Sequence, residues 1–353
     1  NKDNGTWYVM TQYTDWKGER KPKCKRGFAT KREAQDWEQK FQQQSSGDLD
    51  MPFSAFVEIY CREQQPRLKE STWQTKENII QQKILPYFKD RKINEITTKD
   101  VRAWQNEMLA YRNEENKPYS SSYLKTLHNQ LSAIFNYAVR FYDLRSNPAS
   151  KAGNMGSEER KEMLFWTKEE YQKFSEVMMD KPLSYYAFQM LYWTGIREGE
   201  LLALTPADFD FEKGTVKISK TYQRLKGQDV ITSPKTKKSN RTVQMPDFLC
   251  TEIQEFFGMQ YGLKKKDRVF TVTKSYLHHE MDRGAKEAGV KRIRIHDLRH
   301  SHISLLIDMG FSAVAIADRV GHESIEITYR YAHLFPSKQK EMAVKLDFMN
   351  KGV

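Results

Sequence analysis

The clearest pattern in the chain is an amphipathic stretch over residues 120–141. Its apolar side chains recur at spacings of three and four, which is the period of one face of an α-helix. Residues 53–61, 72–85 and 98–111 repeat this period, and the Asn147-Pro148 pair is expected to stop the last helix. The sequence therefore predicts a unit of four helices. The apolar face of its longest helix consists of Leu124, Leu127, Leu131, Ile134, Phe135 and Ala138.

A strand-like pattern precedes this unit. Residues 6–13 are rich in aromatic and β-branched side chains, residues 15–18 supply turn formers, and residues 20–30 can return as a second strand. Thr30 is a suitable cap for a helix over residues 31–44. A small sheet covered by one helix is predicted, with the apolar face of that helix at Ala34, Trp37 and Phe41.

The C-terminal part of the chain mixes both periods. Residues 167–170 form a helix capping box, and helical spacing continues from Leu183 to Gly195. The period then changes to short β-rich runs separated by basic turns, which indicates a small antiparallel sheet. After Lys291 the pattern is helical again. The strands are expected at residues 215–219, 230–233 and 241–245.

These patterns predict three domains. The 353 residues exceed one ordinary domain of about 150 residues. A Ser-Ser-Gly-Asp linker near residue 47 and a charged, glycine-containing stretch over 151–163 separate the patterns. We expect domains at residues 1–46, 50–150 and 160–353. The predicted fold class is a multidomain, mainly α protein with small β-sheets (α+β).

Composition narrows the function. Lys plus Arg number 58 against 46 Asp plus Glu, and the formal net charge of +12 favours a polyanionic partner. Hydrophobic residues at 39% predict a globular protein, and no apolar run reaches the roughly 18 residues of a membrane helix. The three cysteines, Cys24, Cys61 and Cys250, are too far apart for a disulfide framework or a ligand pair. A reducing cytosol is the expected location.

Six cations and one acid lie within residues 17–28 of the predicted N-terminal hairpin. One interpretation is a solvated edge that lysines keep from aggregating. The other is a strand that follows DNA phosphates. On the second interpretation the candidate DNA-binding residues are Lys21, Lys23, Lys25 and Arg26.

Two motifs of the third domain offer cations. A helix breaks at Gly195 and restarts, which puts Arg197 at a new helix N-terminus, where a guanidinium beside free backbone N–H groups suits a phosphate. The alternative is a surface arginine paired with Glu200. The second motif, residues 233–241, holds several lysines between two predicted strands, although most basic hairpins are simply solvated.

A third motif, His-Asp-Leu-Arg-His at residues 296–300, admits two interpretations. His296 and His300 are four apart, as in zinc-binding helices, but no third ligand is evident and an aspartate stands where that motif has glutamate. The favoured interpretation is that His296 and Arg299, one helical turn apart, face the same anion as Arg197. No metal ion and no cofactor are expected.

The fourth motif, residues 321–333, contains a Gly-His pair and then two tyrosines, Tyr329 and Tyr331. In order and spacing, five features resemble the tyrosine recombinase (phage integrase) family, including the integrases of conjugative transposons and integrative elements. These features are Thr-Gly-x-Arg-x-x-Glu, a hairpin lysine, His-x-x-Arg, Gly-His, and a tyrosine nine residues after that last histidine.

The resemblance implies roles for the cations. Arg197 and Arg299 match the two arginines that clamp the scissile phosphate. Lys235 matches the hairpin lysine that acts as general acid, with Lys237 and Lys238 as alternatives if the loop is registered differently. The physical logic agrees, because attack on a phosphodiester builds negative charge on its non-bridging oxygens and guanidinium groups stabilise that charge.

The resemblance also implies a nucleophile. Tyr331 matches the nucleophilic tyrosine, and Tyr329 stands two residues too early. His296 and His322 take the two histidine positions of the family. A phenol with a pKa near 10 is mostly protonated at pH 7, so Tyr331 requires a nearby proton acceptor such as His296. Because bond energy is held in the protein–DNA link, neither ATP nor a metal is required.

The implied architecture is an arm-type DNA-binding domain of sheet plus helix, a helical, SAM-like core-binding domain and a mixed catalytic domain. The implied activity is site-specific recombination of double-stranded DNA at core and arm attachment sites, through a 3′-phosphotyrosyl intermediate and a Holliday junction. A homotetramer on DNA that exchanges C-terminal helices, from Pro336 onward, is expected, with room for an accessory excision factor. The alternatives are a type IB-like topoisomerase, a catalytically silent DNA-binding regulator and, last, a metal-dependent hydrolase.

Overall fold

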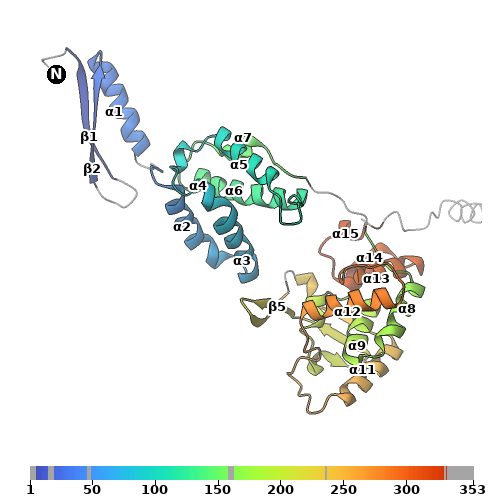
Figure 1. Ribbon diagram of the computed structural model, residues 1–353. Coiled ribbons are helices and arrows are strands. Elements are labelled where there is room, and N and C mark those ends of the chain that lie inside the picture. The colour runs from blue at the N-terminus through green and yellow to red at the C-terminus, as the bar shows by residue number, and fades with distance from the viewer. Residues whose placement is uncertain are drawn as a thin grey trace, which may run out of the picture. The chain divides into compact units, whose positions relative to one another are not determined.

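The computed structural model describes residues 5–14, 20–45, 49–157, 163–234, 237–329 and 331. The chain divides into two compact units, residues 1–161 and 162–353, which are considered separately. Both consist mainly of helices with small antiparallel sheets (Figure 1). The predicted fold class is confirmed. Within the described residues, none of the helices is long and apolar enough to cross a membrane.

The N-terminal segment is a hairpin with one helix. Strand β1 (Trp7–Thr14) pairs antiparallel with β2 (Arg20–Phe28), and α1 (Lys31–Ser45) packs against β1 (Figure 1). The Thr30 hydroxyl accepts a hydrogen bond from the Glu33 backbone N–H at 3.2 Å, which is the predicted cap. Val9 and Ala34 are buried, so the helix covers an apolar face of the hairpin, as its spacing predicts.

The helical segment of the first unit contains the four predicted helices and two short ones. A π-helical turn, Ile80–Ile84, joins the helix that ends at Ile79 to the short helix that begins at Leu85. Buried aromatic rings, among them Phe53, Trp104 and Phe135, form its core. The helices are α2 (Phe53–Gln64), α3 (Glu70–Ile79), α4 (Leu85–Phe88), α5 (Thr98–Ala110), α6 (Ser121–Phe141) and α7 (Pro148–Ala152).

The expectation that Asn147-Pro148 acts only as a stop is wrong. Helix α6 already ends at Phe141, and Pro148 is the first residue of α7. The Asn147 side chain accepts a hydrogen bond from the Ser150 N–H at 3.0 Å. Proline is favoured at the first position of a helix because its missing N–H would have had no partner there. The pair therefore starts a helix rather than ending one.

The second unit is built around a helical core with two small sheets. Thr167 caps α8 with a complete capping box, as predicted. Short 3₁₀ segments occupy Gln65–Arg67 and Ile93–Glu95 in the first unit and Pro206–Asp208 and Lys237–Ser239 in the second. The helices of the second unit are α8 (Lys168–Met178), α9 (Pro182–Thr194), α10 (Glu198–Leu201), α11 (Asp247–Met259), α12 (Lys274–Glu287), α13 (Asp297–Asp308), α14 (Ala313–Val320) and α15 (Glu326–Tyr329).

The expectation of a single sheet between residues 214 and 245 is wrong. Strands β3 (Phe209–Asp210), β4 (Thr215–Ile218) and β7 (Arg241–Gln244) form one antiparallel sheet in the order β3-β4-β7. Strands β5 (Thr221–Leu225) and β6 (Gln228–Thr232) form a separate hairpin. Positive φ angles at the two turn residues, 49° at Lys226 and 80° at Gly227, fit the tight turns whose twist matches paired strands.

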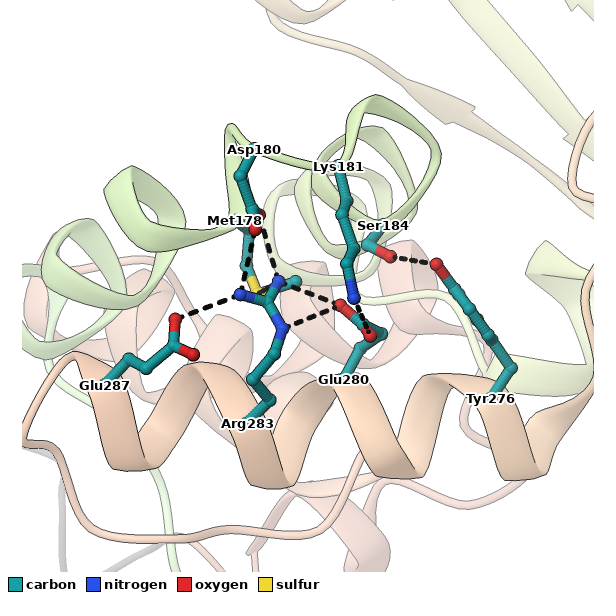
Figure 2. A network of polar contacts seen from close by, with 8 residues as sticks. All are labelled: Met178, Asp180, Lys181, Ser184, Tyr276, Glu280, Arg283 and Glu287. Carbon is teal, nitrogen blue, oxygen red and sulfur yellow. Dashed lines mark hydrogen bonds and ion pairs between the residues drawn. The ribbon is translucent and has the colours of Figure 1, made fainter.

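A polar network attaches α12 to the turn between α8 and α9 (Figure 2). The Arg283 guanidinium on α12 donates to Asp180 of the turn and to Glu280 and Glu287 of its own helix, at 2.9–3.0 Å from the Nη atoms. Lys181 donates to Glu280 at 2.7 Å. We call these five residues the α12 clasp, and it fixes one side of the second unit.

Candidate active site

A helix break positions Arg197. Helix α9 ends at Thr194, Gly195 adopts the left-handed conformation with a φ of +65°, and Arg197 is the N-cap residue of α10. A Cβ atom at Gly195 would lie 2.5 Å from Cδ2 of His302. Glycine is therefore required at this break by both its φ angle and the close approach of a buried ring.

A buried carboxylate binds Arg197. Glu200, 3% exposed, accepts from Arg197 Nη1 at 2.7 Å and from the Arg197 backbone N–H at 2.9 Å. It also accepts two hydrogen bonds from the Arg241 guanidinium, at 3.2 and 3.0 Å. Burial alone would raise the pKa of Glu200, but the hydrogen bonds and charge of Arg241 and the charge of Arg197 outweigh burial and lower it. The carboxylate is therefore ionised.

The sequence allowed two interpretations of Arg197, a phosphate-binding residue or a surface arginine paired with Glu200. The two are compatible in the structure, because the Arg197 side chain keeps 37% of its surface exposed while Glu200 holds one of its nitrogens. The carboxylate fixes the direction of the guanidinium, and the exposed part can still meet an anion.

Arg299 is the most unusual cation of the site. It lies on α13, is 3% exposed and donates from Nη1 to the Gly195 carbonyl at 2.8 Å. Its buried Nη2 has no hydrogen-bond partner among the residues that the structure describes. Burial first, and then the charges of Arg197 and Arg241, lower the pKa of Arg299 to about 9. A buried donor without an acceptor is costly, and a bound anion would satisfy it.

Two predicted histidines lie near these arginines and are neutral. Removal of water from around the imidazole lowers the pKa of His296 to about 4, although the residue as a whole is exposed, and His300, Arg299 and Arg197 lower it further. Burial lowers the pKa of His322 to about 3, again with Arg299 and Arg197. Nδ1 of His322 lies 2.8 Å from the Thr328 hydroxyl. Both rings are therefore neutral near pH 7 and add no positive charge to that of the arginines.

The two tyrosines of the fourth motif have opposite environments. Tyr329 is 55% exposed, whereas Tyr331 is 3% exposed. The Tyr331 ring packs in an apolar cluster, and its hydroxyl forms a hydrogen bond with Nδ1 of His300 on α13. The apolar cluster consists of Ile303, Ile307, Ile316, Val320 and Tyr331.

The contact with His300 differs from the sequence expectation, which offered His296 as the proton acceptor. The two rings are neighbours, with centroids 5.1 Å apart, but Tyr331 reaches His300. Nε2 of His300 faces the buried Asp297 carboxylate at 3.7 Å. Sequence reasoning considered His300 only as a zinc ligand. The signal that it could have used is the position of His300 next to Arg299, at the start of the same helix.

Other predicted residues either fall outside the described residues or belong to the first unit. Lys235 falls outside the described residues, so the choice among Lys235, Lys237 and Lys238 stays a prediction. The segment from residue 336 onward is also outside them. The four candidate DNA-binding residues are exposed along β2 in the first unit, and they are Lys21, Lys23, Lys25 and Arg26.

A metal site was not expected. In the described part of the chain, no group of three or more His, Cys, Asp or Glu side chains could hold a metal ion. His296 and His300 stack edge to face, and His300 contacts Tyr331. The two rings therefore contact each other and Tyr331 rather than forming a metal site with a third such ligand in the described residues.

Sequence profiles match three parts of the chain. Residues 165–338 match the phage integrase family, residues 52–109 match the N-terminal SAM-like domain of phage integrases, and residues 1–45 match an arm DNA-binding domain. The ICEBs1 integrase of Bacillus subtilis (strain 168) is 30% identical over 339 residues, with 90% of each chain covered. The integrase of Staphylococcus phage L54a is 25% identical over 291 residues, covering 72% of this chain and 80% of its own.

Solved structures share the fold. The Tn1549 transposon integrase in complex with transposon right end DNA is 18% identical, with a TM-score of 0.67 over 85% of this chain and 100% of its own. A lambda integrase tetramer bound to a Holliday junction is 17% identical, with a TM-score of 0.58 over 91% of this chain and 94% of its own. With the identity and coverage of the ICEBs1 integrase, these matches show that the chain belongs to the phage integrase family and is a tyrosine-type site-specific recombinase.

Proposed function

We propose that this recombinase cuts and rejoins DNA strands through Tyr331, with a 3′-phosphotyrosyl intermediate and a Holliday junction. The observation that carries the proposal is the buried Tyr331 hydroxyl bound to His300, whose neighbour in the chain, Arg299, has a buried guanidinium nitrogen without an acceptor in the described structure. Arg299 and His300 are adjacent on α13. Arg299 offers a hydrogen-bond donor to an anion, and His300 holds the hydroxyl of the candidate nucleophile, Tyr331.

Charge balance supports phosphate as the anion. Three guanidinium groups, from Arg197, Arg241 and Arg299, surround one carboxylate, Glu200, and leave an excess of two positive charges. A phosphodiester carries one negative charge, and nucleophilic attack places a second on its non-bridging oxygens. In comparable oxyanion sites, each preorganised donor contributes about 3–4 kcal/mol to the transition state.

The proton inventory follows from the neighbours of Tyr331. As the phenolic oxygen bonds to phosphorus, its proton passes to Nδ1 of His300, whose pKa is lowered first by burial, so that the ring begins neutral. The bond from phosphorus to the 5′ oxygen breaks, and Lys235 donates a proton to the departing oxygen. Reversal with the 5′ hydroxyl of another strand releases Tyr331 and joins the strands, and no ATP or metal ion takes part.

The other predicted partners belong to this proposal. Residues 1–46 would bind arm sites through Lys21, Lys23, Lys25 and Arg26, residues 50–150 would bind the core site, and residues 160–353 would cut it. Lambda integrase is a tetramer on its Holliday junction, which supports a homotetramer here. Exchange of C-terminal helices between its protomers is part of the same proposal. The enzyme would integrate and excise a mobile element in the bacterial cytoplasm, in association with the nucleoid, and an accessory excision factor can join it.

A nicked suicide substrate tests the chemistry. The probe is a duplex that carries the element's end sequence, obtained by sequencing the junction of the excised circle, with a nick that lets the 5′ product diffuse away. The wild-type protein is expected to accumulate a covalent complex, and Tyr331→Phe is expected to form none. Tyr329→Phe, which removes the exposed hydroxyl two residues away, is the matched control and should retain the complex.

The same assay separates the alternatives. A covalent complex that survives Tyr331→Phe would overturn the assignment of the nucleophile. Binding without any covalent complex, on the authentic site, would indicate a silent regulator. Relaxation of supercoiled plasmid without regard to sequence would indicate a type IB-like topoisomerase.

A further inference from the structure

Arg241, the first residue of β7, lies where three segments of the second unit meet. Its side chain is 7% exposed and donates two hydrogen bonds to Glu200. Its Nε donates to the Arg319 carbonyl at 3.1 Å, near the end of α14, and its Nη1 donates to the Ser239 carbonyl at 3.2 Å, in the segment that follows Lys235. One side chain therefore joins α10, the segment just before β7, and α14.

The glycine of the Gly-His motif is shaped around this side chain. A Cβ atom at Gly321 would lie 2.8 Å from Cδ of Arg241 and 2.9 Å from the Lys238 carbonyl oxygen. The Gly321 φ of +68° also disfavours other residues. Because His322 follows Gly321 directly, the position of Arg241 is coupled to that of a predicted catalytic histidine.

The charge of Arg241 has an electrostatic consequence for Arg197. Glu200 is buried between the two guanidinium groups and makes two side-chain hydrogen bonds with Arg241 and one with Arg197. Without Arg241, Arg197 would be left as the arginine that is hydrogen-bonded to Glu200 in the described structure. In a poorly solvated site that pairing would neutralise Arg197 and draw it away from a phosphate.

We propose that Arg241 is a positioning residue of the recombinase, which neutralises Glu200 so that Arg197 keeps its charge for the scissile phosphate, and which holds the segment just before β7 against Gly321. This role rests on the proposed function. It requires no contact between Arg241 and DNA, so Arg241 acts on the rate of cleavage rather than on binding.

The first test compares Arg241→Met with the wild-type protein on the nicked substrate. At saturating DNA, the single-turnover rate of covalent complex formation should fall by about 10- to 100-fold. Losses of this size are typical when a residue that orients a directly binding side chain, here Arg197, is removed. The Kd for the same duplex should stay within about twofold. Arg241→Lys, which keeps the charge but not the fork, should recover part of the rate.

A double variant separates charge from structure. Arg241→Met combined with Glu200→Gln removes the uncompensated carboxylate and should cleave faster than Arg241→Met alone. A merely structural role predicts that the second substitution adds further damage. Arg283→Met is the matched control, because it removes an arginine of the α12 clasp, and the folded variant should cleave at the wild-type rate.

A pH profile adds a readout that altered folding does not move. Glu200 faces Arg241 of β7, Arg197 of α10 and Arg299 of α13. Removal of Arg241 removes the largest influence that lowers the pKa of Glu200, so Glu200 should protonate at higher pH in Arg241→Met. Because protonation removes the uncompensated charge as Glu200→Gln does, the acid limb of the cleavage rate should shift, and part of the lost rate should return as the pH falls. An unshifted limb and a wild-type rate in Arg241→Met would overturn the role of Arg241 and leave the proposed function intact. A wild-type protein that forms no covalent complex would overturn the proposed function itself.

Discussion

Two arginine clusters in the second unit have opposite charge balance. In the α12 clasp, Arg283 is surrounded by three carboxylates, from Asp180, Glu280 and Glu287 (Figure 2). In the candidate active-site cluster, two arginines, Arg197 and Arg241, bind the one carboxylate of Glu200, and Nη2 of a third, Arg299, has no acceptor in the described part of the chain. The first cluster is electrostatically complete, and the second lacks an anion.

The pKa shifts follow this balance. Burial would lower the pKa of Arg283, but hydrogen bonds to Glu280 and Asp180 outweigh it and raise the pKa. The pKa of Arg299 is instead lowered to about 9 by burial and by neighbouring cations. An arginine held by carboxylates stabilises the fold, whereas a buried arginine beside other arginines costs stability and gains binding energy when an anion arrives. The direction of the pKa shift therefore distinguishes Arg283, which stabilises the fold, from Arg299, which we propose binds the phosphate.

The largest expected effect comes from Arg299. Arg299→Met should reduce covalent complex formation on the nicked substrate by about 100- to 1,000-fold, because it removes a preorganised donor to the phosphate. The free energy of unfolding should stay unchanged or increase, since a buried, unsatisfied charge disappears. Parallel rate measurements and urea unfolding check both statements, and a large loss of stability would place Arg299 with the structural arginines.

Arg283 should show the reverse. Arg283→Met leaves Glu280 buried with only Lys181, and the free energy of unfolding should fall by about 1–3 kcal/mol. Cleavage at a temperature where the variant is folded should match the wild-type protein. Urea unfolding measures the first result, and Glu287→Gln, which removes a more exposed acid of the same clasp, provides a milder comparison.

The smallest effect concerns the histidines that the cationic cluster keeps neutral. The pKa values of His296, His302 and His322 are lowered to about 4, 3 and 3, first by burial and then by neighbouring cations. Their neutral forms are favoured in the folded state, so stability is full above the unfolded pKa near 6.5 and declines as pH falls toward the folded values.

Each such histidine should contribute at most about 1.4 kcal/mol per pH unit to that decline. Thermal unfolding between pH 7 and pH 5 measures the slope. His302→Gln should reduce it, while His279→Gln, which removes an exposed histidine of α12, should leave it unchanged. If stability depended on pH equally in His302→Gln and His279→Gln, burial of the His302 ring would not contribute to the loss of stability at low pH.

Local sequence signals located most of the helices. Apolar residues at helical spacing predicted α6, and the capping residues Thr30 and Thr167 marked the starts of α1 and α8. These signals work because a cap or an amphipathic face depends on neighbours within a few residues. The Asn147-Pro148 pair gave a wrong prediction because a proline is compatible both with the end of one helix and with the start of the next. The pair alone does not tell the two cases apart.

The sequence by itself determined which residues can form the site, because the order and spacing of the motifs single out Arg197, Arg299 and Tyr331. Only the tertiary structure decided how they are connected. Glu200 binds Arg197, 3 residues away, and Arg241, 41 residues away. Arg241 contacts α14 across 78 residues, and Tyr331 reaches His300 from 31 residues away. Such contacts depend on how separate elements pack, and no local propensity encodes the partner of a buried charge.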